Sequence, residues 1–315
     1  MRVSWGSSKL QLRDNMPFVR NGAIEIYHEI HGSGTPLLFF SETACAGDIW
    51  NTFQVPEFSR DHLVITHDYR GTGKSTRPAV QYSCEDFVDD AAAILDHLNS
   101  GPAILLGHSM GGRVAMLMAL EYPEKVKRII VASVGPGVPG APPIPFKMCK
   151  EMTEWGYEKY VRQHTLEVGW TREYIERHPD RVEHFLNIRM NNLPGLEDYL
   201  RHVVARQACD LSGRIGRITQ PTLVLVGEHD HGSATGASHR IAAEALAKAL
   251  PNGTFEVIPN EAHNYFMTNP DEAHRTIRQF LVSRSWLFVV GSTKPATRHR
   301  RSQPSLTTLE GPTYK

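Results

Sequence analysis

Ser109 lies between two glycines in the pattern Gly-x-Ser-x-Gly and is the first candidate for a chemical role. The apolar run 103–106 precedes it, and a helix-compatible segment, residues 113–120, follows at once. This order predicts a strand, a sharp turn and a helix, with the serine Oγ projecting clear of the strand. Gly107 and Gly111 lack the side chains that would keep strand and helix apart. The pattern indicates a nucleophile elbow, and the alternative is an inert serine in a glycine-rich turn.

A base and an acid that could activate this serine follow two later strands. Residues 221–227 form an apolar run that predicts a buried parallel strand, and Asp230 lies just after it. The strand expected at 255–259 is followed by His263. Catalytic groups in such sheets lie at the carboxyl ends of the strands, and a serine alone is a weak nucleophile. The chain order serine, acid, histidine therefore predicts a triad of Ser109, Asp230 and His263.

Two other interpretations of this segment are possible: a different residue could be the acid, or the segment could bind a metal. The spacing Gly-x-x-Asp favours Asp230, and Glu228 is the fallback. His229 and His231 flank Asp230 in a His-x-His pattern that could bind a metal. Because no matching acidic or histidine-rich segment accompanies this pattern, we expect no metal and no cofactor.

The choice of the base depends on position, because the sequence contains 16 histidines. His263 alone comes shortly after the last predicted strand. His239 and His274 fall inside predicted helices. His108 directly precedes the nucleophile, where we expect it to line the substrate pocket.

Other parts of the sequence predict the strands and helices that must position these groups. Apolar runs and alternations predict further strands at 23–30, 37–40, 63–66 and 128–133. Ser83 can cap the first turn of a helix that runs to about residue 98. Further helices are expected at 238–250 and 270–282. The alternation of strands and helices indicates an α/β fold.

Four segments together resemble the α/β-hydrolase superfamily over roughly residues 18–283. They are the Ser109 elbow, the loop Asp-Tyr-Arg-Gly-Thr-Gly-Lys-Ser at 68–75, the segment 227–230 and the segment around His263. The resemblance implies a mostly parallel central sheet with helices on both faces and a helical cap inserted after the sixth strand. The nearest general resemblance is to carboxylesterases and enol-lactonases with such a cap.

The loop 41–47 departs from the family pattern, because it begins Ser-Glu where the family usually has His-Gly. The resemblance implies an oxyanion hole formed by the N–H groups of Met110 and Thr43, or Ala44 if the loop is shifted. Glu42 replaces a glycine that normally allows close backbone approach. Its carboxylate would oppose a developing oxyanion unless the side chain points away.

The resemblance also suggests how the chain is divided. We expect a loose leader at 1–17, a core formed by 18–140 and 209–283, a helical cap at 141–208 and a disordered basic tail at 284–315. Large apolar side chains are frequent in the cap, and most of them should pack it onto the core. Those expected to line an apolar pocket above the nucleophile are Phe146, Met148 and Trp155.

Composition limits the partners of the protein. The sequence has 34 basic and 34 acidic residues, which argues against nucleic acid as the main partner. It has no apolar run near the length of a membrane span and no apolar signal segment at its start, so we expect no membrane partner and a cytoplasmic protein. Four widely spaced cysteines are expected to be reduced thiols. The oligomeric state stays open.

These residues lead us to expect a serine hydrolase that cleaves a small carboxylic ester or lactone through an acyl-enzyme on Ser109. Hydrolysis of a carbon-carbon bond in ring-cleavage diketones is the alternative, because it uses the same triad. The third possibility is a ligand-binding protein without catalysis, which the Glu42 loop favours and the complete triad opposes. Dehalogenases and epoxide hydrolases of the same fold are disfavoured, because they use an aspartate in place of the serine.

Overall fold

The structure is a computed structural model of the 315-residue chain, and it describes residues 17–231 and 238–283. The predicted tail, and the predicted leader apart from residue 17, lie outside the described residues. The fold below belongs to the compact unit Met1–Val282. Within the described residues, no helix is long and apolar enough to cross a membrane.

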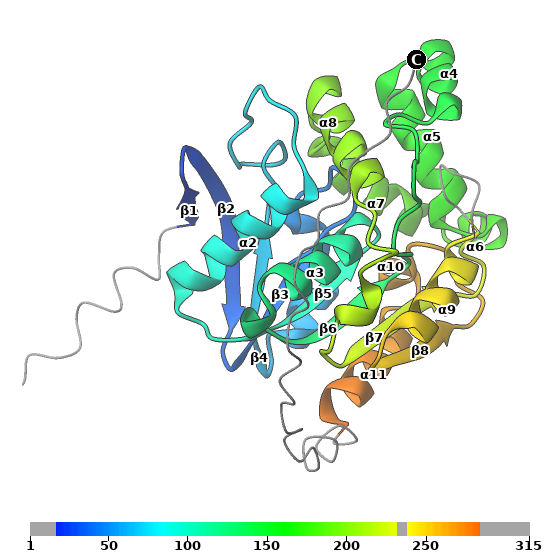
Figure 1. The fold of residues 1–315 in the computed structure, drawn as a ribbon. Helices are drawn as coiled ribbons and strands as arrows, with labels where there is room; N and C mark the ends of the chain where they lie inside the picture. Colours follow the sequence, from blue (N-terminus) through cyan, green and yellow to red (C-terminus); the bar gives the residue numbers. More distant parts are fainter. Residues whose placement is uncertain (1–16, 232–237, 284–315) are drawn as a thin grey trace, which may run out of the picture. The chain divides into compact units, whose positions relative to one another are not determined.

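Eight strands form one sheet in the order β1-β2-β4-β3-β5-β6-β7-β8 (Figure 1). The pairs β1/β2 and β2/β4 are antiparallel, and the five remaining pairs are parallel. Strands β5 and β7 are buried along their whole length, as expected for the central strands of a parallel sheet. The strands are β1 (Phe18–Asn21), β2 (Ile24–Gly32), β3 (Thr35–Phe40), β4 (His62–His67), β5 (Ala103–His108), β6 (Val126–Ala132), β7 (Thr222–Gly227) and β8 (Gly253–Ile258).

Helices cover both faces of this sheet, which confirms the predicted fold class. The core helices are α1 (Gln54–Phe58), α2 (Cys84–Leu98), α3 (Met110–Glu121), α9 (His239–Ala249), α10 (Tyr265–Thr268) and α11 (Pro270–Val282), with short 3-10 turns η1 (Gly47–Trp50), η2 (Pro123–Lys125) and η3 (Ile215–Arg217). Apolar side chains of α2, α3 and α9 pack into one buried cluster, and those of α1 and α11 pack into the other. The two clusters hold the strands in register from both sides.

The helical insertion between β6 and β7 agrees with the predicted cap after the sixth strand. It consists of α4 (Phe146–Trp155), α5 (Tyr157–Gly169), α6 (Arg172–Arg177), α7 (Pro179–Asn191) and α8 (Leu196–Ala208), which gather at one end of the sheet (Figure 1). A third buried cluster joins cap side chains, including Tyr160 and Tyr199, to Ala44 in the loop after β3. This contact ties the cap to the loop that begins one side of the candidate site.

Candidate active site

Ser109 sits between the end of β5 and the start of α3, with φ 55° and ψ −120°. This conformation is strained for a residue with a side chain, and such strain is common at catalytic positions. A Cβ at Gly107 would lie 2.2 Å from the Gly111 carbonyl oxygen, and one at Gly111 would lie 2.2 Å from the Phe40 carbonyl oxygen. Only glycine therefore allows β3, β5 and α3 to approach this closely around the serine.

His263 and Asp230 meet through a hydrogen bond between the loops after β8 and β7. His263 Nδ1 lies 3.0 Å from Asp230 Oδ2, and both side chains are buried. An ionised carboxylate only accepts hydrogen bonds, so Nδ1 carries the donated proton and Nε2 is left free to act as a base. This is the geometry required to orient an imidazole toward a nucleophile.

Ser109 and His263 line the same cavity, which has a volume of about 80 Å³. Within the described residues, Ser109 Oγ and the His263 ring share no hydrogen bond. Contacts between nucleophile and base are often long before substrate binds and tighten in the complex. The structure therefore brings the predicted serine, acid and histidine into one region, with the acid buried behind the histidine.

The charges around His263 favour its protonated form. Burial lowers the pKa of the imidazole, but the Asp230 charge and hydrogen bond outweigh burial, and the pKa is raised above its usual value. Burial of Asp230 opposes ionisation, but His263 and a second histidine lower the pKa of this carboxyl well below its usual value. Asp230 is therefore ionised at neutral pH and stabilises the imidazolium that forms when His263 takes up a proton.

The second histidine is His239, which sequence analysis placed in a helix and gave no role. It is the first residue of α9, and its Nδ1 lies 2.8 Å from Asp230 Oδ1. Asp230 thus accepts a hydrogen bond from a histidine on each carboxylate oxygen. The only signal in the sequence is that His239 begins the first helix after the acid.

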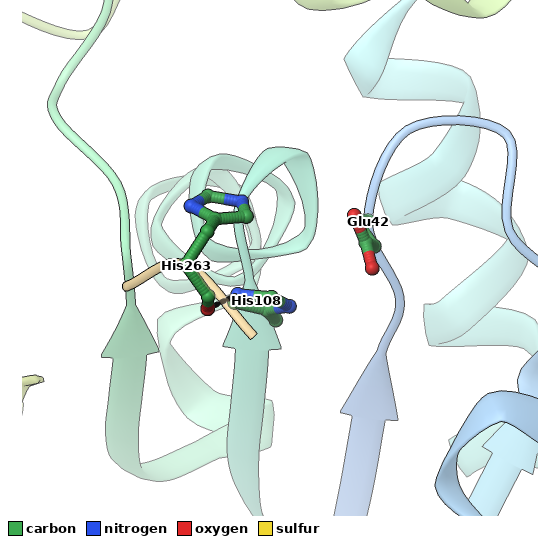
Figure 2. Close-up of side chains that lie close together, drawn as sticks. All are labelled: Glu42, His108 and His263. Carbon is green, nitrogen blue, oxygen red and sulfur yellow. Dashed lines mark hydrogen bonds between the residues drawn. The ribbon is translucent and has the colours of Figure 1, made fainter. Parts of the chain in front are cut away.

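Glu42 faces His108 and His263 from the loop after β3 (Figure 2). Its carboxylate forms an ion pair with Arg189 of α7, at 3.5 Å. Burial opposes ionisation of Glu42, but the Arg189 charge is the main opposing effect and the pKa of the carboxyl is lowered. The charge that replaces the usual glycine is therefore balanced by a cation from the cap.

Two groups of side chains have potential metal ligands close together. One carboxylate oxygen of Glu42 and ring nitrogens of His108 and His263 lie within 4.8 Å of one another, and Asp230, His239 and His263 form a similar group. In the second group, both histidine Nδ1 atoms are already hydrogen bonded to the carboxylate. In the first group, His108 Nε2 is 3.1 Å from the His263 carbonyl oxygen (Figure 2). Several of these ligand atoms are thus already engaged, by the Asp230 carboxylate in the second group and by a backbone carbonyl and Arg189 in the first, and we assign no metal to either group.

Thr43 and Met110, the residues expected to form the oxyanion hole, both line the cavity beside Ser109. Met110 is the first residue of α3, where a backbone N–H has no acceptor within the helix. The Thr43 side chain contacts Arg206 Nη1 at 3.3 Å. Ala44 instead packs into the cap cluster.

The other candidates from the sequence lie farther from this cavity. His108 is buried beneath it and lines a smaller, more apolar cavity that includes Trp50 and Phe266. Met148 belongs to the cap cluster, and Phe146 is 83% exposed. Trp155, at 38% exposed, lines neither cavity. Glu228 is exposed and accepts a hydrogen bond from the Asn260 N–H.

The cap contributes polar groups to the cavity where sequence analysis expected apolar ones. His164 of α5, Arg189 of α7, and Arg206 and Gln207 of α8 all line it. Their position in the cavity gave no signal in the sequence, because the helices of the cap carry many polar and charged residues and their inward faces are not marked by periodicity.

The chain matches the α/β-hydrolase fold family over residues 30–270. A relative from Azorhizobium caulinodans, named "Putative carbamate hydrolase RutD", is 28% identical over 264 residues, which is 81% of this chain and 94% of the relative.

Solved structures with the same fold agree with this match. The enol-lactonase from Burkholderia xenovorans LB400 has a TM-score of 0.75 at 22% identity, covering 85% of this chain and 100% of that one. Est816, described as an N-acyl homoserine lactone degrading enzyme, has a TM-score of 0.72 at 27% identity, covering 84% of this chain and 100% of that one.

Proposed function

Because the chain belongs to the α/β-hydrolase fold family, we propose that it is a serine hydrolase that cleaves a small ester or lactone through an acyl-enzyme on Ser109. The observation that carries this proposal is a strained Ser109 that shares one cavity with His263, whose Nδ1 lies 3.0 Å from Asp230. The cavity volume of about 80 Å³ favours a small substrate.

In the proposed reaction, His263 Nε2 takes the Ser109 hydroxyl proton while Oγ bonds to the substrate carbonyl carbon. The carbonyl oxygen becomes an oxyanion that accepts hydrogen bonds from the Thr43 and Met110 N–H groups. The carbon–oxygen bond to the leaving alcohol then breaks, and His263 returns its proton to that oxygen. Water attacks the acyl-enzyme by the same route, which releases the acid and restores Ser109. In a lactone the released alcohol and acid belong to one molecule.

A carbamate is the second candidate substrate, because the curated relative bears the name of a carbamate hydrolase. The first steps would be the same, with a carbamoyl group on Ser109 in place of the acyl group. Lactone cleavage draws support from Est816, whose described activity is lactone degradation. A panel of lactones, short-chain esters and carbamates, compared by kcat/KM, distinguishes the two.

The first test is reaction with a fluorophosphonate probe followed by intact-protein mass spectrometry. We expect one adduct on the wild type and none on Ser109→Ala. Reaction requires an activated serine, so absence of the adduct on folded wild-type protein would contradict the proposal and favour a ligand-binding protein.

Turnover of variants tests the individual roles. Ser109→Ala and His263→Ala should each lower kcat by a factor of about 10⁴ or more, since the groups of a triad act as a unit. Glu228→Ala is the matched control for the acid, and it should retain wild-type turnover whereas Asp230→Ala should not. Substantial activity in Ser109→Ala would rule out a mechanism in which Ser109 is the nucleophile.

A further inference from the structure

The cavity above Ser109 carries an excess of positive charge. Three arginines line it, namely Arg113, Arg189 and Arg206, and the only carboxylate among its lining residues is Glu42. With neutral histidines, a cavity this small would bind a neutral ester without using these charges. The excess therefore needs either partners within the protein or a ligand of opposite charge.

Two of the three arginines have partners of their own. Arg189 forms the ion pair with Glu42. Arg113 donates to two backbone carbonyl oxygens, that of Gly135 at 3.2 Å and that of Arg206 at 2.8 Å. These contacts hold the cap and the loops together. They pair the Arg189 charge with a carboxylate, although Arg189 Nε is buried without a hydrogen-bond partner in the part of the chain that the structure describes, and they occupy donors of Arg113 with carbonyl oxygens.

Arg206 is different. Its guanidinium has one polar contact among the described residues, from Nη1 to Thr43 Oγ1 at 3.3 Å, and no carboxylate within ion-pair distance. A guanidinium has five N–H donors in a fixed planar arrangement, so most of the donors of this half-buried side chain remain unused. Burial without an acid beside it is unfavourable and lowers the pKa of Arg206.

A neighbouring histidine responds to the same positive charge. His164 of α5 lines the cavity, and its ring stacks on Tyr160. Burial, followed by the charges of Arg206 and Arg189, lowers the pKa of His164 to about 3. His164 is therefore neutral at physiological pH, and the cationic side of the cavity is left to the arginines.

We propose that Arg206 binds a carboxylate group of the substrate, so that the protein acts on small esters or lactones that carry one anionic substituent. The inference rests on the proposed function and names its substrate class. A carboxylate fits the guanidinium because two parallel N–H donors match its two oxygens. Binding would place an anion beside a half-buried cation that has none among the described residues.

The contact of Arg206 with Thr43 also limits where this carboxylate lies. Thr43 is the proposed oxyanion donor, so a carboxylate on Arg206 would sit next to the carbonyl that Ser109 attacks. The cavity of about 80 Å³ leaves room for only a short connection between the two groups. A carboxylate on or next to a small lactone ring meets both conditions.

The substrate test uses two lactones of nearly the same shape, of which one is anionic and one is neutral, γ-butyrolactone-γ-carboxylate and γ-butyrolactone-γ-carboxamide. Ring opening is followed by proton release in a pH-stat. We expect the wild type to prefer the carboxylate and Arg206→Gln to lose this preference through KM. A charge-assisted hydrogen bond corresponds to roughly a 10- to 100-fold change in kcat/KM. Arg206→Lys should keep part of the preference.

Arg172→Gln is the control for loss of one arginine from the cap. The Arg172 side chain is 93% exposed and, within the described residues, forms an ion pair with Glu176, so the preference should not change. If Arg206→Gln slows both lactones equally, Arg206 only positions the Thr43 loop and the proposal fails. It also fails if the wild type does not prefer the carboxylate.

Calorimetry with succinate separates this inference from the proposed function. Ser109→Ala removes the nucleophile, so binding to this variant does not depend on turnover. We expect succinate to bind Ser109→Ala and to lose at least tenfold in affinity when Arg206→Gln is added. Binding with this dependence, where the wild type opens neither lactone and takes up no fluorophosphonate, would support the carboxylate site and reject the hydrolase. No binding, or tighter binding of inorganic phosphate, would overturn the carboxylate site.

Discussion

At the scale of single residues, the acid of the candidate site is held more firmly than a triad alone requires. Asp230 accepts from His263 at 3.0 Å on one oxygen and from His239 at 2.8 Å on the other. With both oxygens occupied, the carboxylate cannot turn away from His263. The two donors also keep Asp230 ionised, although burial by itself would favour the neutral carboxyl.

The pH dependence of turnover follows from the raised pKa of His263. The base must be neutral to take the serine proton, so kcat/KM should fall as the pH drops through this pKa, with a midpoint above 6.5, the usual value for histidine. Asp230→Asn removes the charge that raises the pKa and should move the midpoint of the remaining activity to lower pH. A pH profile of both proteins checks this, and an unchanged midpoint would contradict the coupling.

His239 gives a second prediction at this scale. His239→Ala leaves Asp230 Oδ1 without its donor, and we expect kcat to fall by roughly 10- to 100-fold with little change in KM. His239→Gln retains a donor and should lose less. Steady-state kinetics at a pH well above the His263 midpoint measures both variants, and equal losses would mean that His239 acts through packing alone.

Three residues of this site could be predicted from the sequence, because the serine, the acid and the histidine each lie directly after a predicted strand. The spacing around Ser109, Asp230 and His263 is local information. Arg206 and His239 are brought in by the packing of α8 and α9, and nothing in their local sequence distinguishes them from other charged residues on helices. The polar cavity could not be predicted for this reason.

At the scale of elements, the loop after β4 is tied to α2 by a buried ion pair. Arg70 donates to both oxygens of Asp90 at 2.8 Å, and to Asp86 at 2.6 Å. Asp86 also closes a capping box with Ser83, the residue that the sequence predicted as the cap of this helix. One side chain therefore fixes a loop, a helix end and a buried acid.

Removal of this link should destabilise the fold. Arg70→Ala leaves the Asp90 charge buried without its partner, and such losses cost about 3–5 kcal/mol of unfolding free energy. Urea denaturation followed by circular dichroism measures the change. Arg77→Ala, which removes an exposed contact to the Gly73 carbonyl oxygen, is the control and should stay within about 0.5 kcal/mol of the wild type.

Helices of the cap show why element patterns are incomplete predictors. Phe146 begins α4 and is exposed, whereas Met148, two residues later, is buried in the cap cluster. Size and apolar character identify both as candidates for burial, but the face that meets the core depends on how five short helices pack together. That packing is long-range information, which a helix pattern does not contain.

At the scale of the whole molecule, most of the sheet was predictable, including the edge strand β8, but the short edge strand β1 was not. Each strand expected from an apolar run is present, in an order that places Ser109 at the centre. The strand β1 and the helix α1 were not expected, because β1 has four residues and α1 has five. Elements this short carry too few positions for a periodic pattern to be recognised.

Buried histidines should make the whole fold sensitive to acid. Burial lowers the pKa to about 4 for His28, His67, His108, His202 and His274. The unfolded chain binds these protons near pH 6.5, so stability is present above that pH and is lost as the pH falls toward 4. His263 has a raised pKa and therefore contributes stability at low pH, but the five histidines with lowered pKa values together have the larger effect.

Thermal unfolding between pH 8 and pH 4.5 tests this prediction, and Tm should fall steeply below about pH 6.5. His67→Phe is the informative variant, because the ring packs edge-on against Phe40 and Tyr69 and phenylalanine keeps that shape. We expect a flatter decline of Tm in acid for this variant. An identical decline would mean that other groups control acid unfolding.

The long separation of Ser109, Asp230 and His263 along the chain has a consequence for biosynthesis. Strands β3, β4, β5 and β6 all precede the cap, so the ribosome makes the nucleophile and its supporting strands well before β7 and β8. A nascent chain that ends before residue 263 holds Ser109 without the histidine proposed as its base. Under the proposed mechanism, the growing polypeptide therefore cannot hydrolyse its substrate until the segment after β8 has been made.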